Sequence, residues 1–160
     1  MRPFLSIAFL FFVLNAFSKT KYNDTILTKL HGQGCGIIPN EQEVNYNINL
    51  LKNLQKSDSN NALIYRHLAM QYYFSWAREK DPVLKETLRQ KSIENNVKVL
   101  DLHQFKKVSK VGTIDNLLIL YSYVNDCQNT EKYYGLLKKK EKKSLGTGIP
   151  ELLKKNCNIE

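Results

Sequence analysis

The chain has 160 residues, and its 24 lysine and arginine residues against 15 aspartate and glutamate residues give a formal charge of +9 at pH 7. Three cysteines are too few for a scaffold built from disulfide bonds, so a hydrophobic core must supply most of the stability. No Gly/Ser-rich or Pro-rich linker divides the chain, which indicates one domain.

Residues 1–18 have the three parts of a secretory signal peptide. Arg2 precedes the apolar run Phe4–Leu14, and the small residues Ala16 and Ser18 follow it. A transmembrane helix needs about 20 apolar residues, so this run is too short to span a bilayer. We therefore expect cleavage after Ser18 and a secreted or periplasmic protein with no transmembrane segment after processing. An uncleaved membrane anchor is the alternative.

Residues 19–39 form a polar stretch that predicts a flexible leader. Gly32, Gly34 and Gly36 surround Cys35 and argue against regular structure. The G-x-G-x-G spacing is not a phosphate-binding loop, because no apolar strand precedes it and no Gly-Lys-Ser/Thr follows it.

Residues 40–160 predict a single all-α domain with five long helices and one short helix. Apolar residues recur at the spacing of a helix face, and no alternating run predicts a strand. The short polar connections favour antiparallel neighbours. The predicted helices span residues 40–56, 62–80, 83–102, 113–124, 130–143 and 150–155.

Polar side chains suited to N-cap positions mark the predicted start of several helices. Asn40 precedes the first helix, and Thr130 precedes the fifth. Either Thr113 or Asp115 caps the fourth helix, because Gly112 before it predicts a turn.

The hairpin at residues 62–102 is the predicted centre of the fold, and Asp81-Pro82 separates its two helices. Its first helix carries one apolar stripe: Tyr65, Leu68, Ala69, Tyr72 and Trp76. The small side chain of Ala69 predicts a close approach of the paired helix.

The order of aromatic, leucine, small residue and tyrosine along this stripe resembles the first helix of a tetratricopeptide repeat. Residues 114–124 and 133–137 form a second helix–turn–helix unit of the same general kind. The resemblance implies a helical array whose concave surface binds peptides or proteins. The candidate groove residues are Tyr72, Tyr73, Trp76 and Arg78.

Lysines cluster in the second half of the chain: Lys106, Lys107, Lys110, Lys138–Lys140, Lys142, Lys143, Lys154 and Lys155. A solvated charged face is the favoured interpretation. The alternative is binding to an anionic surface, such as membrane headgroups, an acidic glycan or nucleic acid. Specific nucleic-acid binding is not expected, because the aromatic residues are not interleaved with these lysines.

No residue pattern predicts catalysis, a cofactor or a metal site. His31, His67 and His103 lack the spacing of three or four residues that metal-binding helices use. Cys35 lies in the glycine-containing leader, without the orienting residues that a nucleophile needs. We therefore expect a non-catalytic module whose partner is a protein or a peptide.

Three cysteines allow three intramolecular pairings, and we favour Cys127 with Cys157. A helix at 130–143 carries the chain away from Cys127, and the short helix after it points back. Cys35 is then free or paired with another molecule.

Overall fold

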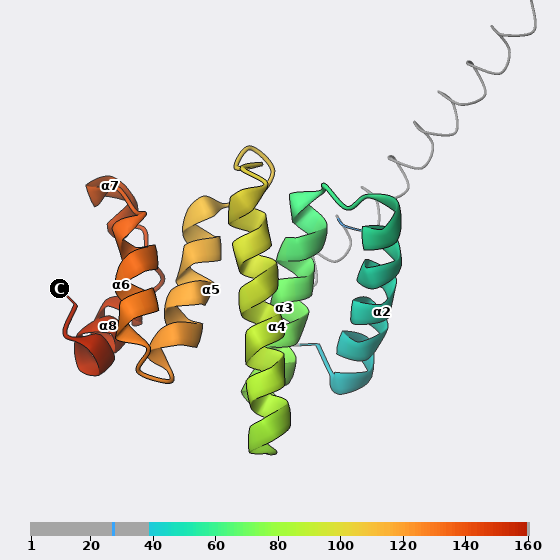
Figure 1. The fold of residues 1–160 in the computed structure, drawn as a ribbon, viewed down its shortest axis with the longest axis horizontal. Helices are drawn as coiled ribbons and strands as arrows, with labels where there is room; N and C mark the ends of the chain where they lie inside the picture. The colour runs from blue at the N-terminus through green and yellow to red at the C-terminus, as the bar shows by residue number, and fades with distance from the viewer. Residues whose placement is uncertain (1–26, 28–38, 160) are drawn as a thin grey trace, which may run out of the picture. The chain divides into compact units, whose positions relative to one another are not determined.

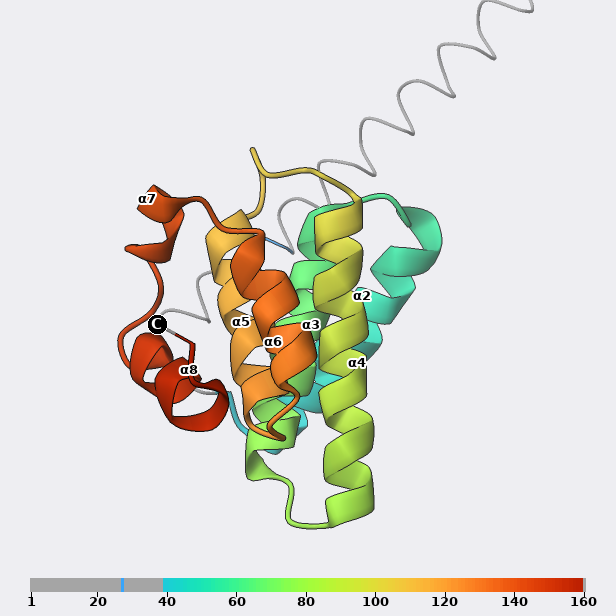
Figure 2. The same ribbon diagram turned by 60° about the vertical axis from the view of Figure 1, so that its left-hand side comes forward.

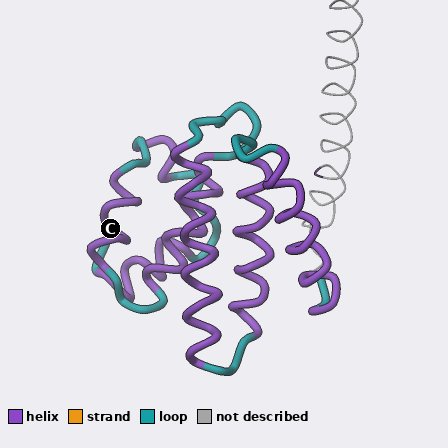
Figure 3. The backbone as a smooth tube through the Cα atoms, turned by 45° about the vertical axis from the view of Figure 1, so that its right-hand side comes forward, coloured by secondary structure: helices purple, strands orange, loops and turns teal. Residues whose placement is uncertain are grey.

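The computed structural model describes Leu27 and residues 39–159. The predicted signal peptide lies outside the described residues, as does the predicted leader apart from Leu27 and Pro39. The described part contains seven α-helices and no strand, which confirms the predicted fold class (Figures 1 and 3). The helices are α2 (Glu41–Ser57), α3 (Ala62–Arg78), α4 (Pro82–Asp101), α5 (Lys110–Ser122), α6 (Cys127–Gly135), α7 (Lys139–Lys142) and α8 (Ile149–Cys157).

Helices that follow one another along the chain pack as antiparallel pairs. The pair α3–α4 has the most extensive contact, and α2, α5 and α6 extend the array on either side (Figure 1). Helices α7 and α8 depart from this pattern, since α7 has no comparable contact with α6 or α8, and α8 returns to pack against both α5 and α6 (Figure 2). The central hairpin predicted at residues 62–102 is therefore present.

The first helix begins where the sequence predicts. The side chain of Asn40 accepts a hydrogen bond of 2.9 Å from the Glu43 backbone N–H, and the Glu43 carboxylate accepts one of 2.8 Å from the Asn40 N–H. This reciprocal pair satisfies two N–H groups that the helix itself cannot. The buried apolar side chains of α2 form the predicted stripe: Val44, Ile48, Leu51 and Leu54.

The α3–α4 turn is held by its acidic side chains. The Asp81 carboxylate accepts a hydrogen bond of 2.7 Å from the Leu84 N–H and caps α4, whose first residue is Pro82. The Glu79 carboxylate accepts hydrogen bonds from the backbone N–H groups of Lys80 and Asp81. Both carboxylates therefore organise the ends of helices.

Ala69 lies where α3 and α4 approach closely, as its small side chain predicts. It is fully buried, and its carbonyl oxygen accepts a 2.9 Å hydrogen bond from the hydroxyl of Ser92 on α4. Since Ser92 is also fully buried, two small residues allow the helices to approach closely.

The predicted start of the fourth helix is wrong. Helix α5 begins at Lys110, because the hydroxyl of Ser109 accepts a 3.1 Å hydrogen bond from the Gly112 N–H and caps the helix. A serine cap contributes about 1 kcal/mol, which offsets the similar cost of one glycine inside a helix. Gly112 therefore lies in the first turn of α5, and Thr113 and Asp115 are not caps.

The predicted helix over residues 130–143 is also wrong in its start and its continuity. Asp126 rather than Thr130 is the N-cap of α6, and the Thr130 hydroxyl donates to the Asp126 carbonyl oxygen at 2.7 Å. The helix ends at Gly135, a poor helix former, and α7 forms a separate turn of helix.

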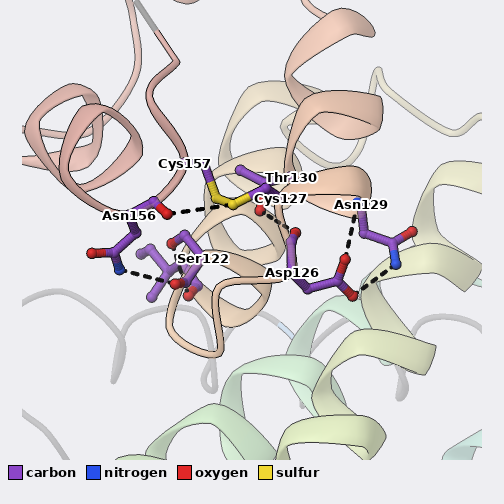
Figure 4. The surroundings of a disulfide bond; sticks show 8 residues. Ser122, Asp126, Cys127, Asn129, Thr130, Asn156 and Cys157 are labelled. Atoms are coloured by element: carbon purple, nitrogen blue, oxygen red, sulfur yellow. Dashed lines mark hydrogen bonds between the residues drawn. A yellow bond between two sulfur atoms is a disulfide. The ribbon is translucent and has the colours of Figure 1, made fainter.

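The cysteine pairing in the structure is the one expected from the sequence. A disulfide joins Cys127 at the start of α6 to Cys157 at the end of α8, with Cα atoms 5.2 Å apart (Figure 4). Beside it, the side-chain amide of Asn156 donates a 2.9 Å hydrogen bond to the Ser122 carbonyl oxygen. Helix α8 continues to Cys157, beyond the predicted end at residue 155.

The largest cluster of buried apolar side chains centres on α5. Four α5 side chains in it have no exposed surface, and the remainder come from α3, α4, α6, α8 and the segment between α6 and α7. Its members are Trp76, Ile93, Ile114, Leu117, Leu118, Leu120, Tyr133, Leu137, Ile149 and Leu153.

A buried arginine connects α4 to α5. The Arg89 guanidinium donates a 3.1 Å hydrogen bond to the Leu120 carbonyl oxygen through Nη1. Its Nε and Nη2 donate to the two carboxylate oxygens of Glu86 at 2.8 and 2.7 Å. These hydrogen bonds lower the pKa of Glu86 from 4.5 to about 2.

The depressed pKa predicts a loss of stability in acid that depends on Glu86. The carboxylate contributes its full stabilisation above pH 4.5 and loses it as the pH falls towards 2. Because the Glu86 side chain is 50% exposed, solvent screening limits the contribution to about 0.5–1 kcal/mol. We expect Glu86→Gln to lower the melting temperature at pH 7 and to match the unmodified protein near pH 2. Glu94→Gln, at an exposed position of the same helix, is the control for general titration.

Candidate functional site

The four predicted groove residues differ in their exposure. Tyr72 and Trp76 are 6% and 5% exposed and belong to the packed interior, whereas Tyr73 is half-buried and Arg78 is exposed. The rings of Tyr73 and Trp76 lie 5.3 Å apart. The helical period of the stripe therefore marks burial at Tyr72 and Trp76.

Arg78 lines an open hollow of about 490 Å³ that we call the α2–α4 groove. The start of α2, the end of α3 and the first half of α4 surround it. Its lining residues are Glu41, Val44, Asn45, Ser75, Arg78, Glu79, Lys80, Leu84 and Leu88.

The groove combines apolar, cationic and acidic side chains. Val44 is buried at its edge, Leu88 is half-buried, and Leu84 is 48% exposed. Within residues 39–159, no ion pair joins Arg78 or Lys80 to a carboxylate. The groove therefore offers apolar contact area beside two positive charges, from Arg78 and Lys80, and two negative charges, from Glu41 and Glu79.

A second exposed feature adjoins the end of the hairpin. The ring of Tyr123, which is 55% exposed, meets Trp76 edge-on with the ring centroids 4.9 Å apart. The ammonium of Lys85 lies 5.7 Å from the Trp76 ring and 5.6 Å from the Tyr123 ring. The sequence did not predict this cluster, because its members come from three different helices.

The predicted lysine cluster is mostly exposed, but two of its members have specific contacts. The Lys110 ammonium donates a 2.7 Å hydrogen bond to the Leu136 carbonyl oxygen and lies 3.7 Å from a Glu141 carboxylate oxygen. The Lys142 ammonium lies 3.7 Å from the centre of the Tyr134 ring. The remaining lysines of the cluster are exposed at the surface.

A polar contact at the interior of the array involves Arg66 and Asp115. The Arg66 guanidinium donates to the Asn96 side-chain oxygen at 3.3 Å, and the Gly146 N–H donates to Asp115 at 3.3 Å. Burial raises the pKa of Asp115, although the Gly146 N–H and the charge of Arg66 oppose that effect. Burial lowers the pKa of Arg66, because it disfavours the charged form of the guanidinium as it does that of the carboxylate. These groups tie α3, α4 and α5 to the loop before α8.

The histidines lie apart from these features. His67 is buried in α3, and the ring of His103 lies 5.9 Å from that of Phe105. His31 is outside the described residues. In the described part of the chain, no three histidine, cysteine, aspartate or glutamate side chains are grouped as metal ligands would be.

The fold is thus that of an all-α protein made of packed antiparallel helix pairs. No protein-family model, curated protein or solved structure matches the chain significantly. None of the helices in the described residues has the length and apolar character needed to span a membrane. The disulfide is consistent with an oxidising compartment outside the cytoplasm.

Proposed function

We propose that the protein is an exported, non-catalytic helical module, similar to tetratricopeptide-repeat proteins, that binds a peptide or a segment of another protein. The observation that supports this most directly is the α2–α4 groove. Its volume of about 490 Å³ lies in the range of ligand sites, and the side chain of Leu84 in it is 48% exposed.

The composition of the groove favours a peptide with an apolar anchor beside polar or charged residues. Leu84 and Leu88 offer contact area to an apolar side chain, and its burial is the main source of affinity. Arg78 and Lys80 can pair with a carboxylate beside that anchor, while Glu41 and Glu79 in the same lining offset their charge.

The exposed lysines favour a second candidate, binding to an anionic surface. These side chains lie on α7, on α8 and in the loop before α5. Such binding weakens steeply as salt rises, because each neutralised charge releases counterions. Binding dominated by apolar contact in the groove depends on salt only weakly.

A matched pair of leucine variants tests the groove. Leu84 and Leu136 are each 48% exposed, but only Leu84 lines the groove. Peptides would be selected from a random displayed library on the purified protein, and their affinities measured at low and high salt. We expect Leu84→Glu to weaken the selected peptides at least tenfold, because it places a charge in the apolar contact. Leu136→Glu should leave the affinity within twofold.

Two results would contradict the groove as the binding site. One is an equal effect of the two variants on affinity. The other is selection of only acidic peptides whose binding disappears at high salt, which would favour the anionic-surface candidate. Circular dichroism of both variants would show that the helices are retained.

A further inference from the structure

A second hollow, of about 320 Å³, lies among α6, α7 and α8, and we call it the C-terminal pocket. It shares no lining residue with the α2–α4 groove. The residues that carry its chemistry are Tyr134, Lys142, Leu145, Pro150, Leu153 and Ile159.

The walls of the pocket are mainly apolar and partly fixed. Leu153 is 1% exposed and belongs to the main buried cluster, so the pocket rests on packed core. The disulfide at Cys157 and the hydrogen bond from Asn156 to Ser122 hold α8 in place. A ligand would therefore enter a site that needs little reorganisation, which lowers the entropic cost of binding.

One ammonium group lies at the pocket without a carboxylate partner. The Lys142 Nζ is 3.7 Å from the centre of the Tyr134 ring, and no ion pair involves Lys142 among the described residues. The nearest carboxylate in sequence, Glu141, is engaged elsewhere. It accepts a 2.7 Å hydrogen bond from the Lys138 N–H and lies 3.7 Å from the Lys110 ammonium.

The surrounding charges make this end of the molecule positive. Glu151 also lines the pocket, but Lys154 lines it as well and offsets that charge. Four further lysines adjoin or lie in α7: Lys138, Lys139, Lys140 and Lys143. The Lys142 ammonium and the surrounding lysines therefore both favour an anion at this position.

We propose that the C-terminal pocket binds a small amphiphilic anion, with a carboxylate at Lys142 and an apolar chain against Leu145, Leu153 and Ile159. The volume lies near the lower end of the range for ligand sites, so a medium-length chain fits better than a long one. The apolar walls supply affinity, and the ammonium selects the sign of the head group.

Three amphiphiles with the same chain test the sign of the charge. Decanoate, decanol and decyltrimethylammonium would each be titrated below their micelle-forming concentrations, with methyl and amide NMR shifts mapping the site. We expect decanoate to bind about tenfold more tightly than decanol and to shift α8 and Tyr134 resonances. The cationic amphiphile should not bind the pocket.

Two lysine variants separate the pocket from the general positive field. Lys142→Gln removes the ammonium at the pocket, whereas Lys140→Gln removes an exposed lysine from the same helix and changes the net charge equally. We expect decanoate affinity to fall about tenfold in the first variant and to stay within twofold in the second. Vesicles with anionic lipids serve as a further arm, which shows whether a membrane supplies the same chemistry.

Several outcomes would overturn the proposal. Equal binding of decanoate and the cationic amphiphile would show that charge plays no part. Equal losses in the two lysine variants would show a diffuse electrostatic effect. Absence of decanoate binding at about 1 mM, or binding of anionic vesicles without binding of monomeric decanoate, would also exclude a pocket for this ligand class.

Discussion

Replacing both Cys127 and Cys157 by serine is expected to lower the free energy of unfolding by about 3–4 kcal/mol. The bridge spans 30 residues, and closing a loop of that length restricts the unfolded chain by about this amount in the chain-entropy model. The loss should be large for this protein, because a domain of this size has a total stability of about 5–15 kcal/mol. Urea denaturation under non-reducing conditions measures it.

A reducing agent supplies the control for the cysteine variant. It should shift the urea midpoint of the unmodified protein towards that of the double variant, and it should leave the midpoint of the double variant unchanged. An unmodified protein that is insensitive to reduction would contradict the expected role of the bridge. So would a double variant with an unaltered midpoint.

Replacing Leu68 by alanine is expected to cost about 2–5 kcal/mol of unfolding free energy. Leu68 is 2% exposed in the α3 face that meets its neighbouring helices, so the smaller side chain leaves a cavity in packed surroundings. The same substitution at Leu84, which is 48% exposed, should cost less than about 1 kcal/mol. The comparison separates loss of packing from any general effect of the substitution.

Urea and thermal denaturation of the two leucine variants provide the measurement. Similar midpoints for Leu68→Ala and the unmodified protein would mean that this face of α3 is not the packed one. A loss for Leu84→Ala as large as that for Leu68→Ala would contradict the exposed position of Leu84.

The sequence predicts the helices well where the chemistry that starts and buries them is local. Asn40 caps α2, and the stripe through Leu68 and Ala69 identifies the buried face of α3. The errors arise where two local signals compete. Gly112 favours a turn, but the cap supplied by Ser109 extends α5 through it, and Asp126 likewise starts α6 before Thr130.

The disulfide is predicted correctly although the helix boundary beside it is not. The sequence predicts Cys127 in the turn before a helix at 130–143, whereas Cys127 is the first residue of α6. Both placements put it at the same turn, and a helix that returns to that turn brings Cys157 beside it. The topology of neighbouring helices was therefore sufficient, and the exact helix boundary was not needed.

The candidate binding residues were less predictable than the fold. The sequence places Arg78 of α3 at a groove, and Arg78 lines the α2–α4 groove. The sequence does not identify its other lining residues, such as Val44 and Leu84, because they come from α2 and α4. Periodicity shows which side of a helix is apolar, but it does not show where the ends of three helices meet. Trp76 shows the converse problem, because an aromatic residue on a stripe is equally compatible with a groove and with the core.

The return of α8 to α5 and α6 has a consequence for how the chain folds. Contacts between consecutive helices close only short loops, so α2 to α6 can assemble rapidly. Docking of α8 instead requires a longer segment of the chain to turn back. The Cys127–Cys157 disulfide that fixes α8 forms by thiol oxidation, which takes seconds to hours. The last helix should therefore be secured after the others, and until then the apolar surface that it covers on α5 is open to solvent.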